Sequence, residues 1–184
     1  MTQRQLFVAS GLGALRVVVS LAGATLPGIF GVPGMSGAIN VLWVGGFLAL
    51  ACLVTRSHWA ATVSAVVYSI LALPLPLSGP PGFFPKIFVG LASGLAADLV
   101  FRAAWRHEKL APPLIGAAGQ TTLGIVFAWL GILFQVPAID KYVALQFSPL
   151  GMSMTVVLGG LSGFLGGLAF GAIKDSDLVR RARG

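Results

Sequence analysis

Long apolar stretches dominate the pattern of hydrophobic and polar positions along the chain. Six of them come near the ~20 residues that a helix needs to cross a bilayer. They are residues 6–26, 38–55, 58–75, 84–104, 112–135 and 149–173. The third is the weakest, because Pro74 and Pro76 cut it short. None alternates as the strands of a small β-barrel do. The pattern predicts an all-α membrane protein, a bundle of six transmembrane helices that forms a single domain over residues 1–184.

Basic residues gather at alternate ends of these stretches. They lie before the first stretch, between the second and third, between the fourth and fifth, and after the sixth: Arg4, Arg56, Arg106, Lys109, Lys174, Arg180, Arg181 and Arg183. The loops on the other side, 27–37, 76–83 and 136–148, carry only Asp140 and Lys141 as charged residues. By the positive-inside rule, this asymmetry predicts that both termini are cytoplasmic and that residues 174–184 form a basic cytoplasmic tail.

The composition agrees with a location in the lipid bilayer. Hydrophobic residues make up 57% of the chain and charged residues 9%, against about 25% charged in a soluble domain. The mean hydropathy is +0.93. The positive-inside rule accounts for the net charge of +7, so we expect no nucleic-acid partner. The single cysteine, Cys52, excludes an intramolecular disulfide and a cysteine metal cluster.

Small residues recur at four-residue spacing in three of the stretches, which favours close helix packing in lipid. The sixth stretch carries Gly159, Gly163, Gly167 and Gly171, and the fourth carries Gly90 and Gly94. We expect these two sets to pack inside the bundle. The first stretch pairs Ala9 with Gly13 and Ser10 with Ala14. This small face could serve the bundle or a second membrane protein.

Four charged residues lie within the apolar stretches. Asp98 and Arg102 are four residues apart on one helix face, which predicts a pair, with Arg102 reaching the interface. Arg16 lies ~15 Å into the first helix, so it should face protein or water, and Asp98 is a possible partner. Lys86 begins the fourth stretch on the outer side. It either points out to the surface or turns inward to a ligand.

Motifs of catalysis are missing from the chain. It contains no nucleotide-binding G-x-x-x-x-G-K-[ST] loop and no H-E-x-x-H pattern. Three of its five acids, Glu108, Asp175 and Asp177, lie in the basic regions, and His58 and His107 fall at the cytoplasmic edge. We therefore expect that the protein is not an enzyme and that it binds neither a metal nor a cofactor.

Polar and aromatic residues in the outer half favour a pocket for a small organic ligand. The candidate substrate-binding residues are Asn40, Trp43, Tyr68, Lys86, Trp129, Gln135, Tyr142 and Met152, accompanied by Ser69, Asp140, Gln146 and Thr155. The aromatic members could instead form the aromatic belt at the membrane interface. Asn40 and Gln135 are harder to explain that way, because an amide gains nothing in an apolar segment.

Three segments have a recognisable pattern: "GALRVVVSLAG" (13–23), "SGAINVLWVGGFLALA" (36–51) and "FFPKIFVGLASGLAADLVFR" (83–102). Together they resemble the substrate-binding S components of energy-coupling factor (ECF) transporters, which take up vitamins and their precursors in prokaryotes. The resemblance implies a multi-pass protein of the prokaryotic plasma membrane, with a pocket open to the outside. The sequence "AIN" around Asn40 resembles that of the family branches that bind thiamine-related precursors.

The resemblance also implies a partner, a transmembrane coupling protein that carries two ATPase subunits. Family members dock on it through an Ala-x-x-x-Ala pattern in the first helix. The matching positions here are Ala9 and Gly13, or Ser10 and Ala14, which depart from strict alanine spacing. Three other functions remain open: a stand-alone small-molecule transporter or channel, a non-catalytic membrane scaffold, and a lipid-modifying enzyme.

Overall fold

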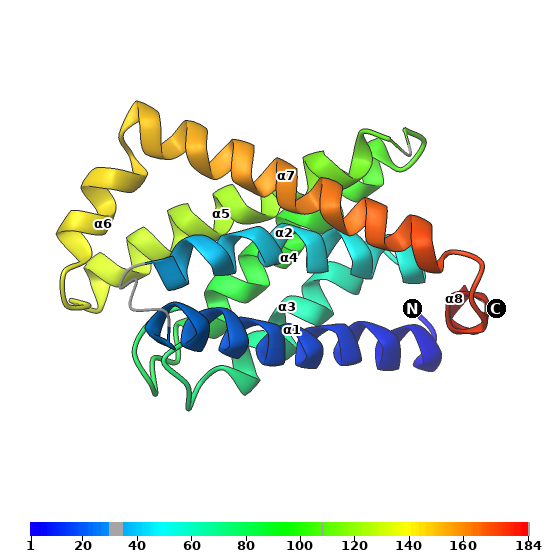
Figure 1. Cartoon of the computed structure of the whole chain (residues 1–184), viewed down its shortest axis with the longest axis horizontal. Coiled ribbons are helices and arrows are strands. Elements are labelled where there is room, and N and C mark those ends of the chain that lie inside the picture. Colours follow the sequence, from blue (N-terminus) through cyan, green and yellow to red (C-terminus); the bar gives the residue numbers. More distant parts are fainter. Residues whose placement is uncertain (30–34, 108, 184) are drawn as a thin grey trace.

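The computed structural model of the protein describes residues 1–29, 35–107 and 109–183, without the side chains of residues 26–39 and 178 (Figure 1). Within these residues every regular element is a helix, which confirms the prediction of an all-α fold. The helices are α1 (Gln3–Ile29), α2 (Met35–Thr55), α3 (Ala60–Leu71), α4 (Lys86–Ala104), α5 (Ala111–Leu133), α6 (Ile139–Gln146), α7 (Pro149–Ile173) and α8 (Asp177–Arg183).

Four of the helices, α1, α4, α5 and α7, are long and apolar enough to cross a membrane. The helix α3 ends at Leu71, ahead of Pro74 and Pro76, because a proline and the residue before it disfavour helix. Its 12 residues extend ~18 Å, against a hydrocarbon core of ~30 Å. The four long helices make the structure compatible with a membrane location, while the count of six spans stays a prediction.

Two short helices were not expected. The helix α6 forms inside the segment 136–148, which the sequence analysis treated as a loop, and α8 forms inside the basic tail. Figure 1 shows both termini at one end of the bundle, together with α8, and shows α6 at the opposite end. We call these the terminal end and the loop end. The connection between α3 and α4, residues 72–85, also lies at the loop end (Figure 1).

Glycines bring α2, α5 and α7 into backbone contact. A Cβ atom added to Gly45 would lie 2.7 Å from the Cα of Gly116 and 2.8 Å from the carbonyl oxygen of Gly159. One turn further along α7, the hydroxyl of Ser162 accepts the backbone N–H of Gly46 at 2.8 Å. We call the Gly45–Gly116–Gly159 contact the glycine junction. It confirms that Gly159 and Gly163 of α7 pack inside the bundle, whereas Gly171 of the same face is exposed.

Small residues of α4 and α1 pack against α3. A side chain at Gly94 would collide with the backbone of Thr62, and one at Gly90 with the hydroxyl of Ser69. On α1, Ala9 is fully buried, and a side chain at Gly13 would collide with the carbonyl oxygen of Ser64. Ala9 and Gly13 therefore face the interior of the bundle, not a surface that a partner can reach.

Asp98 does not form either of the pairs expected for it. Its carboxylate accepts the backbone N–H groups of Ala61 and Thr62 at 3.2 and 2.9 Å, and the Thr62 hydroxyl at 2.6 Å. These groups belong to the first turn of α3, whose N-terminal partial positive charge favours a carboxylate. The guanidinium of Arg102 lies instead over the ring of Trp59, 5.5 Å from its centre. Asp98 thus caps α3 from a neighbouring helix.

Candidate functional site

Lys86 turns into the protein at the loop end. Only 2% of the residue is exposed, and its Nζ donates hydrogen bonds to the carbonyl oxygens of Ala72 and Leu75 at 3.1 and 2.8 Å. These carbonyls belong to the C-cap of α3 and to the turn after it, where the helix leaves its last carbonyls without partners. The ammonium therefore ties the end of α3 to the start of α4. The sequence allowed Lys86 to point outward or inward, and in the structure it points inward.

Arg16 is the second buried cation, also 2% exposed. Its guanidinium carbon lies 3.9 Å from the centre of the Tyr68 ring, a cation–π contact between α1 and α3. Its Nε has no hydrogen-bond partner among the described residues. The Tyr68 hydroxyl in turn shares a hydrogen bond of 3.2 Å with the hydroxyl of Ser78. An aromatic ring thus takes the place of the carboxylate expected as the partner of Arg16.

Both cations line one enclosed cavity, which we call the cation cavity. Its lining comprises Arg16, Tyr68, Ser69, Ala72, Ser78, Lys86, Val89, Gly90, Ser93 and Leu123, with no carboxylate among them. Its volume is about 10 Å³, which at most admits one water molecule. Two positive charges without a negative one attract an anion, and the lining hydroxyls add hydrogen-bonding capacity. A larger anion enters only if the surrounding segments move apart.

Three amide side chains outside the cation cavity also carry buried polar atoms. Asn40 Oδ1, Gln120 Oε1 and Gln146 Nε2 are buried without a hydrogen-bond partner among the described residues. The other amide atom of Gln146, Oε1, accepts from the hydroxyl of Thr155 at 3.4 Å. Buried polar atoms without partners are rare in native proteins, so each calls for an explanation. A bound polar molecule would supply the missing hydrogen-bond partners.

The glycine junction sets these amides at one level of the bundle. Asn40 precedes Gly45 by five residues on α2, and Gln120 follows Gly116 by four on α5. Because α2 and α5 run in opposite directions (Figure 1), both amides lie ~6–8 Å from the junction, toward the loop end. The backbones of α2, α5 and α7 thus approach one another closely on the terminal side of these two amides.

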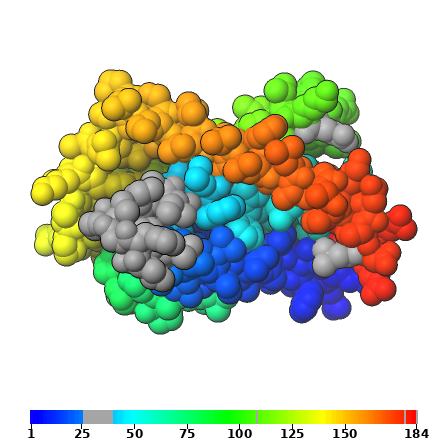
Figure 2. Space-filling model, viewed as in Figure 1, coloured from blue at the N-terminus to red at the C-terminus, as the bar shows by residue number. Residues whose placement is uncertain are grey.

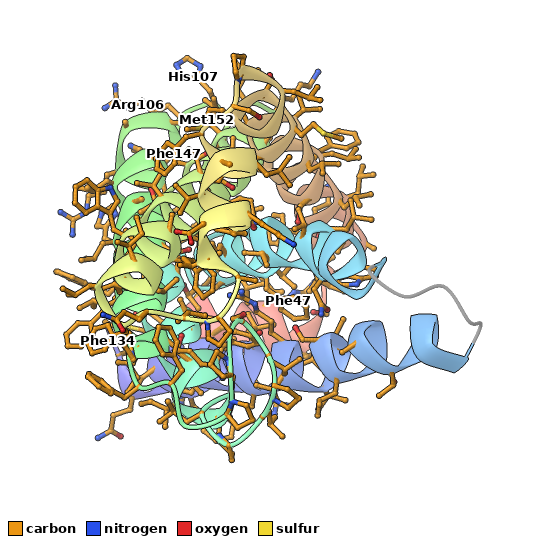
Figure 3. All side chains as sticks on the ribbon, turned by 90° about the vertical axis from the view of Figure 1, so that its left-hand side faces the viewer. Phe47, Arg106, His107, Phe134, Phe147 and Met152 are labelled. Atoms are coloured by element: carbon orange, nitrogen blue, oxygen red, sulfur yellow. The ribbon has the colours of Figure 1, made fainter. Side chains whose placement is uncertain are left out.

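Four further candidates lie away from the cation cavity. Trp43 and Trp129 are 40% and 69% exposed, which fits the alternative of an interfacial belt. Gln135 is exposed and has a φ of 50°, so it ends α5 in a left-handed turn. Met152, in the first turn of α7, is half-buried and lies near Phe147 at the edge of the loop end in Figure 3.

Tyr142 joins α6 to α5 through an edge-to-face contact with Phe127, with ring centres 5.1 Å apart. The residue is half-buried, and burial raises the pKa of its phenol. A phenol in such surroundings stays neutral near pH 7 and offers one hydroxyl to a ligand. Among the eight candidates, the structure brings Tyr68 and Lys86 together.

Two residues of the site escaped the list of candidates drawn from the sequence. Arg16 was treated as a charge in need of a partner, although a cation deep in a helix is itself a functional signal. Gln120 lies in the polar run "GQTTLG" within an otherwise apolar stretch, which was the available signal for it. Its burial, with 5% exposed, appears only once α5 is packed against α7.

Comparisons with known proteins find no match: no family model, no curated protein and no solved structure is significantly similar to the chain. The function must therefore be argued from the residues of this chain.

Proposed function

We propose that the protein is a substrate-binding membrane subunit that captures a small organic anion, in the manner of the S component of an ECF importer. The observation that carries the proposal is the cation cavity, where Arg16 and Lys86 are both buried and none of the described lining residues is a carboxylate. A charge in the middle of a membrane helix costs at least ~2.5 kcal/mol by insertion scales. Arg16 is such a charge, and Lys86 is buried beside the same cavity at the start of α4. A ligand that neutralises both is the best explanation of their shared cavity.

The charge of the cavity narrows the class of ligand. A carboxylate or phosphate would receive hydrogen bonds from Arg16 and Lys86, and the amides of Asn40 and Gln120 could bind the polar part of an organic ring. A thiamine-like cation would meet two like charges instead. We therefore favour a vitamin or precursor that carries an acidic group over the thiamine-related compound that the context of Asn40 indicated.

Ligand entry would open the connection between α3 and α4. Lys86 holds the carbonyls of Ala72 and Leu75, so an anion that takes over the ammonium releases that segment. Ser78, Gly79 and Gly82 lie in the same segment with positive φ angles, and glycine adopts such angles without strain. Binding of the anion and the shape of this loop are coupled through one side chain.

The orientation and partners belong to the same proposal. The positive-inside rule places six spans with both termini in the cytoplasm, and so sets the loop end outside. A coupling protein with two ATPase subunits would then drive uptake, and this chain would perform no catalysis. With Ala9 and Gly13 inside the bundle, docking would use the outer face of α1, where Ser10 and Ala14 are half-buried and Gly11 is exposed.

A ligand panel tests the proposal. Purified protein is titrated with biotin, pantothenate and nicotinate as acidic vitamins and with thiamine as the cation, by isothermal calorimetry and thermal shift. We expect an acidic compound to bind, and Arg16→Gln or Lys86→Gln to weaken it ~10- to 100-fold, because hydrogen bonds to charged groups contribute ~1.5–3 kcal/mol. Lys141→Gln, an exposed cation on α6 at the same end, serves as the matched control.

Binding of thiamine in preference to every acid, or an equal loss in the Lys141 control, would refute the anion site. Co-expression with candidate coupling proteins separates the remaining functions. A stable complex with a coupling protein and two ATPases supports the S component. Ligand uptake into vesicles by the chain alone supports a stand-alone transporter, and binding of no small molecule supports a scaffold.

A further inference from the structure

A groove of about 1170 Å³ lies at the terminal end, far from the cation cavity along the bundle. Its lining comes from the ends of α2, α4 and α7, the start of α5, and α8, together with Arg56, His58, Trp105, Arg106 and Lys109 from the turns between helices. In Figure 1 the turn between α4 and α5 stands apart from the end of α7, and Figure 2 shows the surface hollowed between the same green and orange regions. The groove is therefore open to the surroundings of the bundle.

The groove has a cationic rim. Five basic side chains line it: Arg56, Arg106, Lys109, Lys174 and Arg183. His58 adds an imidazole, and the lining residues that the structure describes include no acidic side chain. Figure 3 shows Arg106 and His107 reaching outward from the bundle at the α4–α5 turn. Cations contributed by four separate segments converge on one space, so an anion is the complementary ligand.

The floor of the groove is apolar. It is formed by Leu53, Phe101, Phe164, Leu168 and Phe170. Phe164 and Leu168 on α7 are 48% and 56% exposed, so no other part of the described chain covers them fully. Gly167 and Gly171 carry no side chain to fill the space, and an added Cβ at Gly171 would meet nothing within 4 Å. The floor thus continues from the cationic rim onto the lipid-accessible side of α7.

The helix α8 builds one wall of the groove. Val179 and Ala182 pack against Val54, and the guanidinium of Arg183 donates to the carbonyl oxygens of Leu53 and Val54 at 2.7 and 3.3 Å. Arg183 therefore caps the end of α2 and holds α8 across the terminal end. This leaves Arg56, Arg106, Lys109 and Lys174 as the cations best placed to receive a ligand.

We propose that this groove binds an anionic phospholipid, with the phosphate among the rim cations and the acyl chains along the floor on α7. Basic pockets between membrane helices on the cytoplasmic side are suited to anionic headgroups. A free phosphate would use the rim alone and leave the apolar floor exposed to water. A lipid matches both, and the groove exceeds the ~300–1,000 Å³ of ordinary small-molecule pockets. The site requires a membrane location and is independent of the substrate that the cation cavity takes.

Trp105, a lining residue, reports occupancy directly. Trp43, Trp59 and Trp129 are all exposed, so replacing each by Phe leaves Trp105 as the single fluorophore. This protein is reconstituted in phosphatidylcholine vesicles with increasing mole fractions of brominated phosphatidylglycerol, or of brominated phosphatidylcholine as the neutral lipid. We expect quenching by phosphatidylglycerol to saturate at a mole fraction at least tenfold lower than quenching by phosphatidylcholine.

Charge variants then locate the site. In Arg56→Gln/Arg106→Gln/Lys174→Gln the preference for phosphatidylglycerol should fall at least tenfold. The control Arg4→Gln/Arg180→Gln/Arg181→Gln removes the same charge from exposed residues at the same end and should change it less than twofold. A third variant replaces the three rim residues with the other basic residue (Arg→Lys and Lys→Arg) and should retain the preference. If the Gln variant does not fold, this variant and the wild-type lipid comparison still decide the outcome.

Three results would overturn the proposal. One is equal quenching by both lipids in the wild-type protein, which means ordinary lipid contact. Another is an equal loss in the control variant, which means bulk attraction to the charged surface. The third is loss of phosphatidylglycerol quenching on addition of millimolar inorganic phosphate or an acidic peptide at constant ionic strength, which assigns the rim to that ligand.

Discussion

Asp98 should stabilise the bundle through the first turn of α3, and its replacement tests this directly. Four backbone N–H groups open the helix. Those of Ala60 and Val63 reach the carbonyl oxygens of Ser57 and Trp59, and the two between them donate to Asp98. Asp98 is 2% exposed, so water does not take its place readily. Its substitution should leave the start of α3 without acceptors.

The hydrogen bonds set the size of the effect. In Asp98→Ala, two backbone N–H groups lose their acceptor, and each buried group without a partner costs ~1–3 kcal/mol. The Thr62 hydroxyl can rotate toward another acceptor, so we expect the free energy of unfolding to fall by about 4 kcal/mol. In Asp98→Asn one carboxylate oxygen becomes an amide donor that faces a donor, while the other acceptor remains. We expect a loss of about 2 kcal/mol.

Unfolding in mixed detergent micelles, followed by circular dichroism at rising SDS fraction, measures both losses. Asp140→Asn is the matched control, because Asp140 is an exposed carboxylate in the first turn of α6, and it should cost under ~0.5 kcal/mol. If Asp98→Asn and Asp98→Ala both lie within ~0.5 kcal/mol of the wild type, the capping role is refuted. If Asn costs as much as Ala, the negative charge matters more than the count of hydrogen bonds.

Three further changes have defined outcomes. Lys86→Met should speed amide hydrogen exchange across residues 72–85, because two carbonyls lose their donor, and unchanged exchange would contradict the tie. Gly116→Val should cost several kcal/mol of unfolding free energy or prevent folding, since backbone atoms of α7 occupy the space, whereas Gly171→Ala should be neutral or slightly stabilising. Stability should fall as pH rises above ~10, because partial burial raises the pKa of the Tyr142 phenol and the unfolded chain therefore ionises first. Tyr142→Phe should remove that part of the pH dependence.

The positions of six of the helices, α1 to α5 and α7, could be read from the apolar stretches. Each observed helix overlaps its predicted range, and Pro74 and Pro76 shortened α3 as expected. The helices α6 and α8 could not be found that way. The side chain of Ile139 packs onto Gly131 of α5, and Val179 packs on Val54 of α2, so these short helices depend on contacts with distant parts of the chain.

The candidate site was predictable only in part. Lys86 and Tyr68 stood out as polar residues in the outer half, but their joining with Arg16 depends on how α1, α3 and α4 pack. Spacing within one helix favoured Asp98 with Arg102. The start of α3 offered Asp98 better partners, because two N–H groups and a helix dipole outweigh one cation that can reach water.

The sequence by itself determined the all-α class, the approximate ends of the long helices and the gathering of basic residues at one end of the bundle. These properties depend on local hydrophobicity and on charge counts, which neighbouring helices do not alter. The tertiary structure decided which polar groups meet: Asp98 with the start of α3, Arg16 with Tyr68, and Lys86 with the carbonyls after α3. A membrane helix presents every face to apolar surroundings, so its hydrophobic pattern does not mark the face that turns inward. The glycine contacts and the hydrogen bonds across helices mark that face, and they exist only in the folded bundle.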